Sequence, residues 1–235
     1  DKFEKVDFEK INIKEMPELE QYMLHKIYNL NSVFKKNFEK YNFHTLYKEL
    51  LNFCTSDLSA FYFDIRKDVL YCDSLDSKKR KSTIILLKVI LDSLLKWFAP
   101  ILSFTTEEIY QLIGRNNKSI HLEKFTKFPK NFNNIELNNK MKEIIKIRDI
   151  CNISIEEKRA SKEIGSSLEA DLKINLNEKL QKVTSNIDFS ELCITSKAEV
   201  SYNEDVETTA ITSKAKGTKC PVCWKINEGP CPRHP

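Results

Sequence analysis

The stretch Pro17-Glu-Leu-Glu-Gln-Tyr-Met23-Leu-His-Lys-Ile27-Tyr-Asn-Leu30-Asn-Ser-Val-Phe34-Lys-Lys-Asn-Phe38-Glu-Lys-Tyr41 decides the fold of the first half of the chain. Its apolar residues recur at steps of three or four: Met23, Ile27, Leu30, Phe34, Phe38 and Tyr41. This spacing places them on one face of a helix of about six turns that opens after the proline. The opposite face carries lysine and glutamate, so the stretch predicts an amphipathic helix with one buried side.

Similar patterns continue to residue 114. The predicted starts of the next helices are Asn42, Ser56 or Asp57, the charged run 77–82 and a capping box at residues 105–108. The second helix is expected to bury Leu46, Tyr47, Leu50, Leu51 and Cys54. Four or five amphipathic helices in about 100 residues make a helical bundle.

The helix after the charged run has a pattern of its own. The residues expected to face inward are Ile84, Leu87, Leu91, Leu94, Leu95 and Phe98. Those expected to face water are Lys88, Asp92, Ser93 and Lys96. Pro100 should end this helix, and Gly114 should cap the last one. No Ser/His/Asp set, glycine-rich phosphate loop or paired-histidine helix occurs in the bundle, which favours a recognition surface or scaffold over an enzyme active site.

The second half predicts a small mixed α/β module. A helical pattern runs over residues 137–162 and is closed by Gly165, and strict alternation over residues 168–177 then predicts a half-buried strand. A short helix over 178–184 and strands over 192–194 and 199–202 complete the module. Residues 203–219 show no periodicity and are expected to be a linker or edge segment.

Four soft ligands close the sequence: Cys220, Cys223, Cys231 and His234, in the pattern C-x2-C-x7-C-x2-H. This pattern matches the tetrahedral demand of one structural zinc ion, with no open position for catalysis. Two disulfides or unligated thiols are the alternatives. The chain has seven cysteines, an odd number, and no signal-like apolar start, which favours zinc over disulfides.

Composition and charge restrict the class of protein. Hydrophobic residues make up 41% of the chain, and no transmembrane run occurs, so a soluble, cytoplasmic protein with no membrane partner is expected. The formal net charge of +4 is matched by the segment from Thr212 onward, which carries five basic residues and one acidic residue. A basic tail on a neutral body favours a polyanion partner at that end.

Several motifs resemble a known family. They are Met16 to Leu19, the run from Asn52 to Cys72, Trp97 to Glu108, and Lys162 to Ala170, in that order. Together with the Cys-x-x-Cys-Trp tail, they resemble the C-terminal third of bacterial isoleucyl-tRNA synthetases, from about Met16 onward. The family pattern usually has a fourth cysteine where His234 stands here, and imidazole is also a sound zinc ligand.

The resemblance implies part of a class I aminoacyl-tRNA synthetase. Its implied domains are a linker over 1–16, an anticodon-binding helical bundle over 17–115, a junction helix and α/β module over 116–202, and a linker with zinc tail over 203–235. The complete ligase joins isoleucine to its tRNA with ATP and edits mischarged valine. The HIGH-type and KMSKS-type signatures and the editing domain do not occur here, so this chain is expected to be inactive without the other domains.

The resemblance also implies RNA contacts with the anticodon side of isoleucine tRNA. The candidates are Trp224, Lys225, Arg233, Lys219 and Arg66. Trp224 is expected to offer a plane for a base, or else to cover the small core beside the zinc. Arg66 could instead pair with Asp64 or Asp68. The charged run 78–81 could contact RNA or could be a solvated helix start.

The protein is expected to be a monomer that works with the catalytic and editing domains of its own chain. The alternatives are a freestanding zinc-containing RNA-binding module and a protein-interaction bundle. Salt dependence of binding separates RNA from protein partners, because phosphate neutralisation makes affinity fall steeply with added salt.

Overall fold

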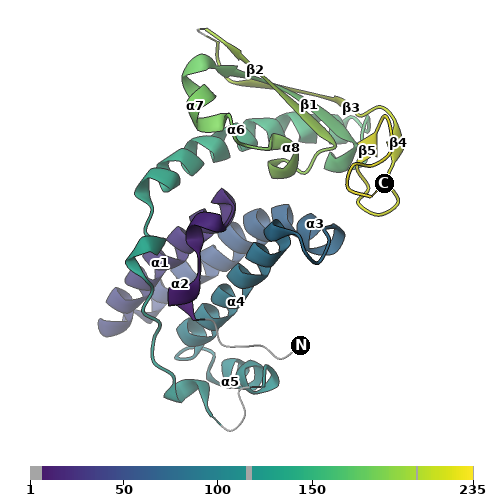
Figure 1. The fold of residues 1–235 in the computed structure, drawn as a ribbon. Coiled ribbons are helices and arrows are strands. Elements are labelled where there is room, and N and C mark those ends of the chain that lie inside the picture. The colour runs from purple at the N-terminus through teal and green to yellow at the C-terminus, as the bar shows by residue number, and fades with distance from the viewer. Residues whose placement is uncertain (1–6, 115–117, 205, 235) are drawn as a thin grey trace. The chain divides into compact units, whose positions relative to one another are not determined.

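A computed structural model of the chain describes residues 7–114, 118–204 and 206–234 (Figure 1). The chain divides into two compact units: residues 1–66 with 74–138, and residues 67–73 with 139–235. Most described residues are helical, and the two small sheets lie in the second unit. The predicted class, mainly α with a small α/β part, is confirmed. Residues 1–6 of the predicted linker lie outside the described residues.

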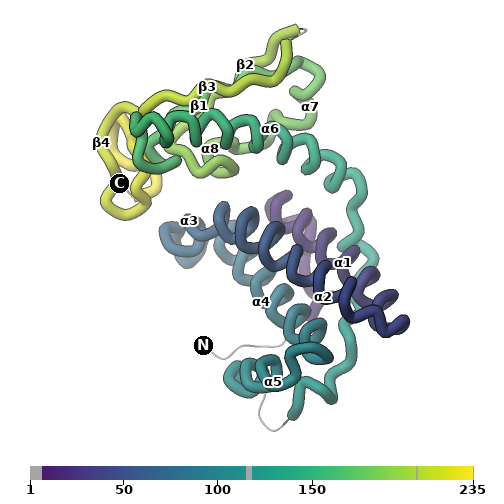
Figure 2. The backbone as a smooth tube through the Cα atoms, turned by 180° about the vertical axis from the view of Figure 1, so that it is seen from behind, coloured from purple at the N-terminus to yellow at the C-terminus, as the bar shows by residue number. Residues whose placement is uncertain are grey.

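The first unit is a helical bundle. Its helices are α1 (Glu18–Glu39), α2 (Phe43–Asn52), α4 (Lys78–Phe98) and α5 (Ser103–Leu112), and α3 (Asp64–Cys72) begins in it. Single 3-10 turns lie at Phe8–Lys10, Ile13–Glu15, Ile120–Leu122 and Lys130–Phe132. Helix α1 packs against both α2 and α4, as Figure 2 shows. Its buried residues include Met23, Ile27, Leu30 and Phe34, four of the six residues predicted to line this face.

Three of the predicted helix starts are found, including the charged run, where α4 begins after Ser77, and the start at Ser56 or Asp57 is wrong. Helix α1 follows Pro17 directly, and Asn42 caps α2 by accepting a hydrogen bond from the Thr45 amide at 3.4 Å. No break occurs at Ser56 or Asp57, because a π-helical segment (Phe53–Phe63) continues α2 into α3. Phe53, Leu58, Phe61 and Tyr62 are buried from this segment. Burial of these large side chains outweighs the local capping preference of serine and aspartate.

The buried stripe predicted for the second helix is only partly right. Leu46 and Leu50 are buried, whereas Tyr47 and Leu51 are 42% and 44% exposed. Tyr41, predicted to continue the α1 stripe, lies beyond the helix end and is 82% exposed.

The capping box predicted at residues 105–108 is wrong. Helix α5 starts two residues earlier, at Ser103, with no side-chain cap. Glu107 instead accepts hydrogen bonds from the Ser119 hydroxyl and the Ile120 amide, at 2.8 and 2.9 Å. The predicted box used Glu108, whereas the neighbouring Glu107 binds the loop after the helix. Gly114 has φ +82°, the left-handed conformation expected of a C-terminal cap.

The predicted water-facing side of α4 is also wrong. Asp92, Ser93 and Lys96 are buried, and Lys96 Nζ lies 2.7 Å from Asp92 Oδ2. Lys96 also donates to the hydroxyl of Thr126 at 3.3 Å. The segment around Thr126 covers this side of the helix, and the polar groups are paired inside, as burial requires. Ile84, predicted inside, is 38% exposed.

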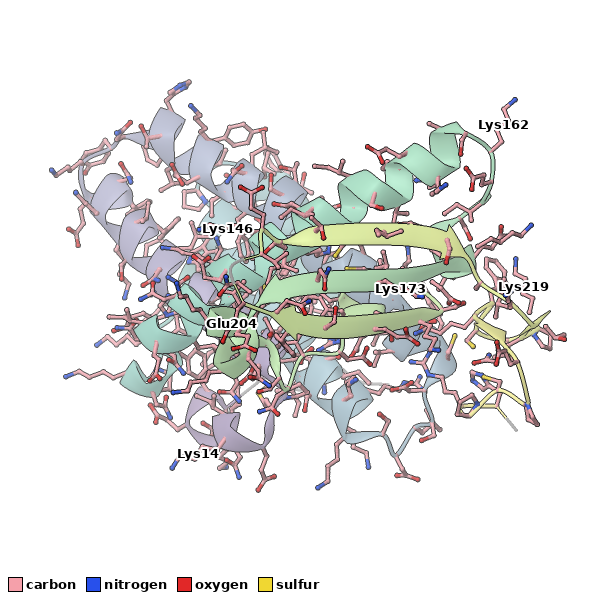
Figure 3. The ribbon with its side chains drawn as sticks, turned by 90° about the horizontal axis from the view of Figure 1, so that it is seen from above. Lys14, Lys146, Lys162, Lys173, Glu204 and Lys219 are labelled. Carbon is pink, nitrogen blue, oxygen red and sulfur yellow. The ribbon has the colours of Figure 1, made fainter. Side chains whose placement is uncertain are left out.

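The second unit is a three-stranded sheet with helices on one face. Strand β1 (Ala170–Asn177) lies between parallel β2 (Lys197–Asn203) and antiparallel β3 (Thr209–Lys214). Helix α6 (Ile135–Ala160) runs along one face, and the Ser154 and Thr212 hydroxyls are 2.8 Å apart. Figure 3 looks onto the other face, where Lys173 of the central strand lies. The alternation predicted for β1 is confirmed, with Ala170, Leu172, Ile174 and Leu176 buried.

Three predictions for this unit differ from the structure. The strand predicted at 192–194 is the last residue of helix α8 (Phe189–Leu192) and the turn that follows it. This helix is capped by Asp188, which accepts from the amides of Ser190 and Glu191. The predicted linker 203–219 contains β3 and β4 (Thr218–Lys219). Helix α6 ends at Ala160, and Lys162 rather than Gly165 is left-handed, with φ +61°. Helix α7 (Gln181–Thr184) and the 3-10 turns Ser167–Glu169 and Glu178–Leu180 complete the unit.

The division into units differs from the predicted domain boundaries. Residues 118–138 belong with the bundle, where Ile120 and Phe132 are buried. Among the described residues, no helix is long and apolar enough to cross a bilayer.

Candidate metal centre

The four predicted ligands meet at the C-terminal end of the second unit. One donor atom from each of Cys220, Cys223, Cys231 and His234 lies within 4.8 Å of all the others. The first two cysteines lie in the turn between β4 and β5 (Ile226–Asn227), and the other pair lies in the next turn. Gly217 allows this hairpin, because at φ +120° an added Cβ would lie 2.1 Å from the carbonyl oxygen of Asn227.

The distances between donor atoms match a tetrahedral ion. The sulfurs of Cys223 and Cys231 are 3.7 Å apart, and His234 Nδ1 lies 3.7 Å from the sulfurs of both Cys220 and Cys231. Bonds of about 2.3 Å to sulfur and about 2.0 Å to nitrogen separate tetrahedral ligands by roughly 3.5–3.8 Å. A disulfide requires about 2.05 Å. The residues present can therefore hold a metal ion, and the cysteines are free.

Backbone groups of the hairpin favour the thiolate form of Cys220, the first candidate ligand. Backbone N–H groups of Cys223 and Val222 lower the pKa of the Cys220 thiol to about 6. The thiolate is the form that binds a metal. Burial has the opposite effect on Cys223, whose pKa rises to about 11. The amide of Trp224 closes the turn by donating to the carbonyl oxygen of Cys220 at 3.0 Å.

The last ligand is fixed by the end of helix α3. His234 Nε2 lies 2.9 Å from the carbonyl oxygen of Cys72, so Nε2 carries the proton and Nδ1 presents its lone pair to the sulfurs. The Cys72 thiol lies 3.8 Å from the Val222 carbonyl oxygen, and burial followed by nearby Asp68 raises its pKa to about 11. Cys72 therefore supports the site with its backbone, not as a ligand.

Arg233, predicted as a phosphate contact, holds the same helix end. Its guanidinium donates to Asp68, and to Asp73 Oδ1 from Nε and Nη2 at 2.7 and 2.6 Å. Burial opposes the charge, but the hydrogen bonds and charges of the two carboxylates outweigh it and raise the pKa of Arg233. Two carboxylates already satisfy this cation, so it is a structural clamp.

Arg66, also predicted as an RNA contact, lies in a buried ion pair. Arg66 is 3% exposed, and its Nε and Nη2 donate to the two carboxylate oxygens of Glu20 at 2.6 and 2.8 Å. Its guanidinium is therefore shielded from solvent and paired with a carboxylate. Asp68, one of the two alternative partners that the sequence offered, accepts from Arg233.

The remaining RNA candidates lie around the hairpin. Trp224 is 59% exposed and left-handed, with φ +64°. Lys219 Nζ lies 5.6 Å from the centre of its ring and 3.9 Å from a Glu169 oxygen (Figure 3). Lys225 is half-buried. An indole that covered the metal core would be mostly buried, so the exposure favours the alternative of an open aromatic plane beside a cation.

The residues that sequence reasoning missed are Asp68, Cys72 and Asp73, about 160 residues before the ligands they support. Two acidic residues close to a helix end are common, and nothing in that pattern points to a distant metal site. Only the tertiary contact assigns them a role.

The helical bundle and the cysteine/histidine cluster point to the class of RNA-binding parts of tRNA ligases. Residues 20–174 match the family described as the anticodon-binding domain of tRNA ligase, and the chain belongs to this family. It is similar along its whole length to isoleucine–tRNA ligases, which confirms the resemblance seen in the sequence.

Three relatives illustrate the similarity. The isoleucine–tRNA ligase of Pelagibacter ubique (strain HTCC1062) is 63% identical over 234 residues, which is 100% of this chain and 26% of the relative. Those of Bartonella quintana (strain Toulouse) and Bradyrhizobium diazoefficiens (strain JCM 10833) are 35% and 37% identical over 97% of this chain, or 25% and 24% of the relatives. The chain thus spans about a quarter of the length of the curated relatives it matches.

Proposed function

We propose that this chain is the part of an isoleucine–tRNA ligase that holds the anticodon arm of isoleucine tRNA. The observation that carries the proposal is the match of residues 20–174 to the anticodon-binding domain of tRNA ligases, within a chain similar throughout to isoleucine–tRNA ligases. The complete enzyme joins isoleucine to its tRNA with ATP and removes mischarged valine in an editing domain. The proposed setting is a monomeric enzyme in the cytoplasm. The comparisons do not favour a freestanding module.

The contribution of this chain to that reaction is positional. Binding energy from contacts remote from the reacting atoms can orient the substrate at a catalytic domain. Discrimination among tRNAs then depends on which bases the chain reads and on which phosphates it holds.

We propose Zn²⁺ as the ion held by Cys220, Cys223, Cys231 and His234. Three thiolates and an imidazole suit zinc by softness and geometry, and four protein ligands leave no open coordination position. The ion is structural, and it holds the turn that presents Trp224.

Trp224 is the proposed stacking plane for one unpaired base. Trp224→Ala is expected to weaken binding of isoleucine tRNA by about tenfold, because base–aromatic stacking contributes roughly 1–3 kcal/mol. Metal content and the unfolding midpoint should stay unchanged, since the side chain is mostly exposed. Filter binding at matched salt measures the affinity. Equal affinities of variant and wild type would remove the stacking role.

The carboxylate clamp gives a second prediction. In the double variant Asp68→Asn/Asp73→Asn, affinity for Zn²⁺ should fall about tenfold, because groups that orient a ligand typically contribute 10- to 100-fold. Competition with a coloured chelator measures it. Asp76→Asn is the control, because Asp76 is exposed and pairs only with Lys81 among the described residues. A double variant with the affinity of this control would show that Arg233 does not position His234.

Binding of the full chain to isoleucine tRNA and to a non-cognate tRNA, each with and without a chelator, tests the proposed function. Tighter binding of isoleucine tRNA, weakened by the chelator, is the expected result. Equal binding of both tRNAs, or no binding, would contradict it.

A further inference from the structure

The turn between α1 and α2 presents exposed aromatic side chains among lysines. Tyr41 is 82% exposed, Tyr47 is 42% exposed and Phe43 is 38% exposed. We define the aromatic corner as these three residues with Lys40, His44 and Lys48, which are also exposed. In Figure 2 the turn lies at one end of the bundle.

The backbone at Tyr41 is unfavourable for a tyrosine. The amides of Tyr41 and Asn42 donate to the carbonyls of Phe38 and Asn37, at 3.0 and 2.9 Å. This pair of bonds ends a helix with a left-handed residue that is usually glycine, and Tyr41 has φ +55°. Tyr41 is therefore strained, and its ring is exposed to solvent and not buried in the core. Strained residues of this kind gather at functional sites.

The exposed rings pack against other aromatic rings that lead into the core. The rings of Tyr41 and Phe43 meet edge to face with centroids 6.3 Å apart, and Phe43 contacts Phe38 in the same way at 6.0 Å. Phe38 stacks on buried Phe34 at 5.7 Å. Phe43 and Tyr47 are four residues apart and share one side of α2, so the aromatic surface continues along the helix.

The charge of the residues around the aromatic corner indicates which kind of partner binds there. Residues 35–49 contain four lysines and two glutamates. Among the described residues, neither Lys40 nor Lys48 pairs with a carboxylate. Lysines beside exposed aromatic rings suit a single-stranded nucleic acid, because the rings stack on bases and the cations hold phosphates. Residues 20–174, which include the corner, match an anticodon-binding domain.

We propose that the aromatic corner is a stacking platform for unpaired bases of an RNA loop, with Lys40 and Lys48 holding the adjacent phosphates. The proposal rests on the proposed function, because that function supplies the loop. It assigns to the bundle an RNA contact of its own, in addition to the one proposed for Trp224.

The test measures binding of the full chain to the isoleucine tRNA anticodon stem-loop by fluorescence anisotropy. Tyr41→Ala and Tyr47→Ala should each weaken binding about tenfold, and the pair about a hundredfold. Tyr41→Phe should keep the wild-type affinity, because it keeps the ring. Phe104→Ala on α5 is the matched control, because Phe104 is 92% exposed and the four residues that follow it include two glutamates and no lysine.

Tyr41→Gly separates binding from folding. Glycine tolerates φ +55°, so this variant should unfold at a higher temperature and still lose the affinity that Tyr41→Ala loses. If Tyr41 stabilised the fold, Tyr41→Gly would unfold at a lower temperature than wild type.

The outcomes also separate this proposal from the function beneath it. If wild type binds the stem-loop and both alanine variants match Phe104→Ala, the corner does not hold RNA and the proposal fails. If wild type binds neither the stem-loop nor isoleucine tRNA, the proposed function and the corner both fail.

Discussion

Replacing Glu20 by glutamine is expected to lower the free energy of unfolding of the first unit by about 3–5 kcal/mol, the effect of removing one partner of a buried ion pair. Glu20 is fully buried, and its carboxylate accepts from Arg66, from the Tyr62 hydroxyl at 3.0 Å and from the Thr83 hydroxyl at 3.3 Å. Glutamine cannot compensate the charge of Arg66, which is 3% exposed. These contacts join α1 to the π-helical segment, α3 and α4, so the loss affects the whole bundle.

Urea unfolding followed by tryptophan fluorescence measures this effect. Trp97 is fully buried in the first unit, and a Trp224→Phe background leaves it as the single fluorophore of its kind. Glu39→Gln is the control on the same helix, because Glu39 is exposed and should change stability by less than about 0.5 kcal/mol. A loss below about 1 kcal/mol for Glu20→Gln would show that water reaches the pair.

Removing both charges gives a stricter check. In Glu20→Leu/Arg66→Met neither charge of this pair remains, so part of the lost stability should return. The Tyr62 hydroxyl would then lack its acceptor, which limits the recovery. If the double variant is less stable than Glu20→Gln, packing around the two side chains contributes more to the free energy of unfolding than their charges do.

Local pattern predicted what depends on neighbours in sequence. The Asn42 cap, the alternation of β1 and the Cys220 to His234 spacing each need only a few adjacent residues. The burial of Asp92 and Lys96 could not be predicted in this way, because the segment around Thr126 that covers them lies 30 residues further along. Strand β3 has little periodicity of its own, and its pairing with β1 stabilises it.

The candidate site follows the same division. The ligands were predicted from their spacing, whereas the residues that orient them were not. Arg66 and Arg233 were both predicted as RNA contacts, and Arg66 also had the alternative of pairing with Asp64 or Asp68. Each has carboxylate partners far along the chain, 46 residues away for Arg66 and about 160 for Arg233. A basic residue is therefore a candidate RNA contact only after its possible ion pairs have been located.

Removing the metal is expected to unfold the hairpin and leave the rest of the chain folded. Within residues 216–234 only Cys220 and Cys223 are buried, so the core of this segment consists of its own ligands. Structural zinc contributes about 10–16 kcal/mol to the folding of zinc-finger peptides. No apolar burial on this scale is available here to replace it. The bundle and the three-stranded sheet have separate cores and should keep their stability.

Hydrogen exchange of the full chain before and after chelation measures this effect. Amides between Cys220 and His234 should lose their protection, and those of β1 should keep it. Cys223→Ser should reproduce the chelated state, whereas Cys54→Ser, a half-buried cysteine outside the cluster, should leave metal content unchanged. Protection of the hairpin that survives chelation would contradict a metal-dependent fold.

The same removal shows what the metal does for RNA. If the ion acts only by presenting Trp224, chelation of wild type should weaken binding about as much as Trp224→Ala, and chelation of Trp224→Ala should add nothing, since two changes that break one contact are not additive. A further loss on chelating the variant would mean that Lys219 or Lys225 also depends on the folded hairpin. The aromatic corner lies in the other unit, so its contribution to binding should be the same with and without metal.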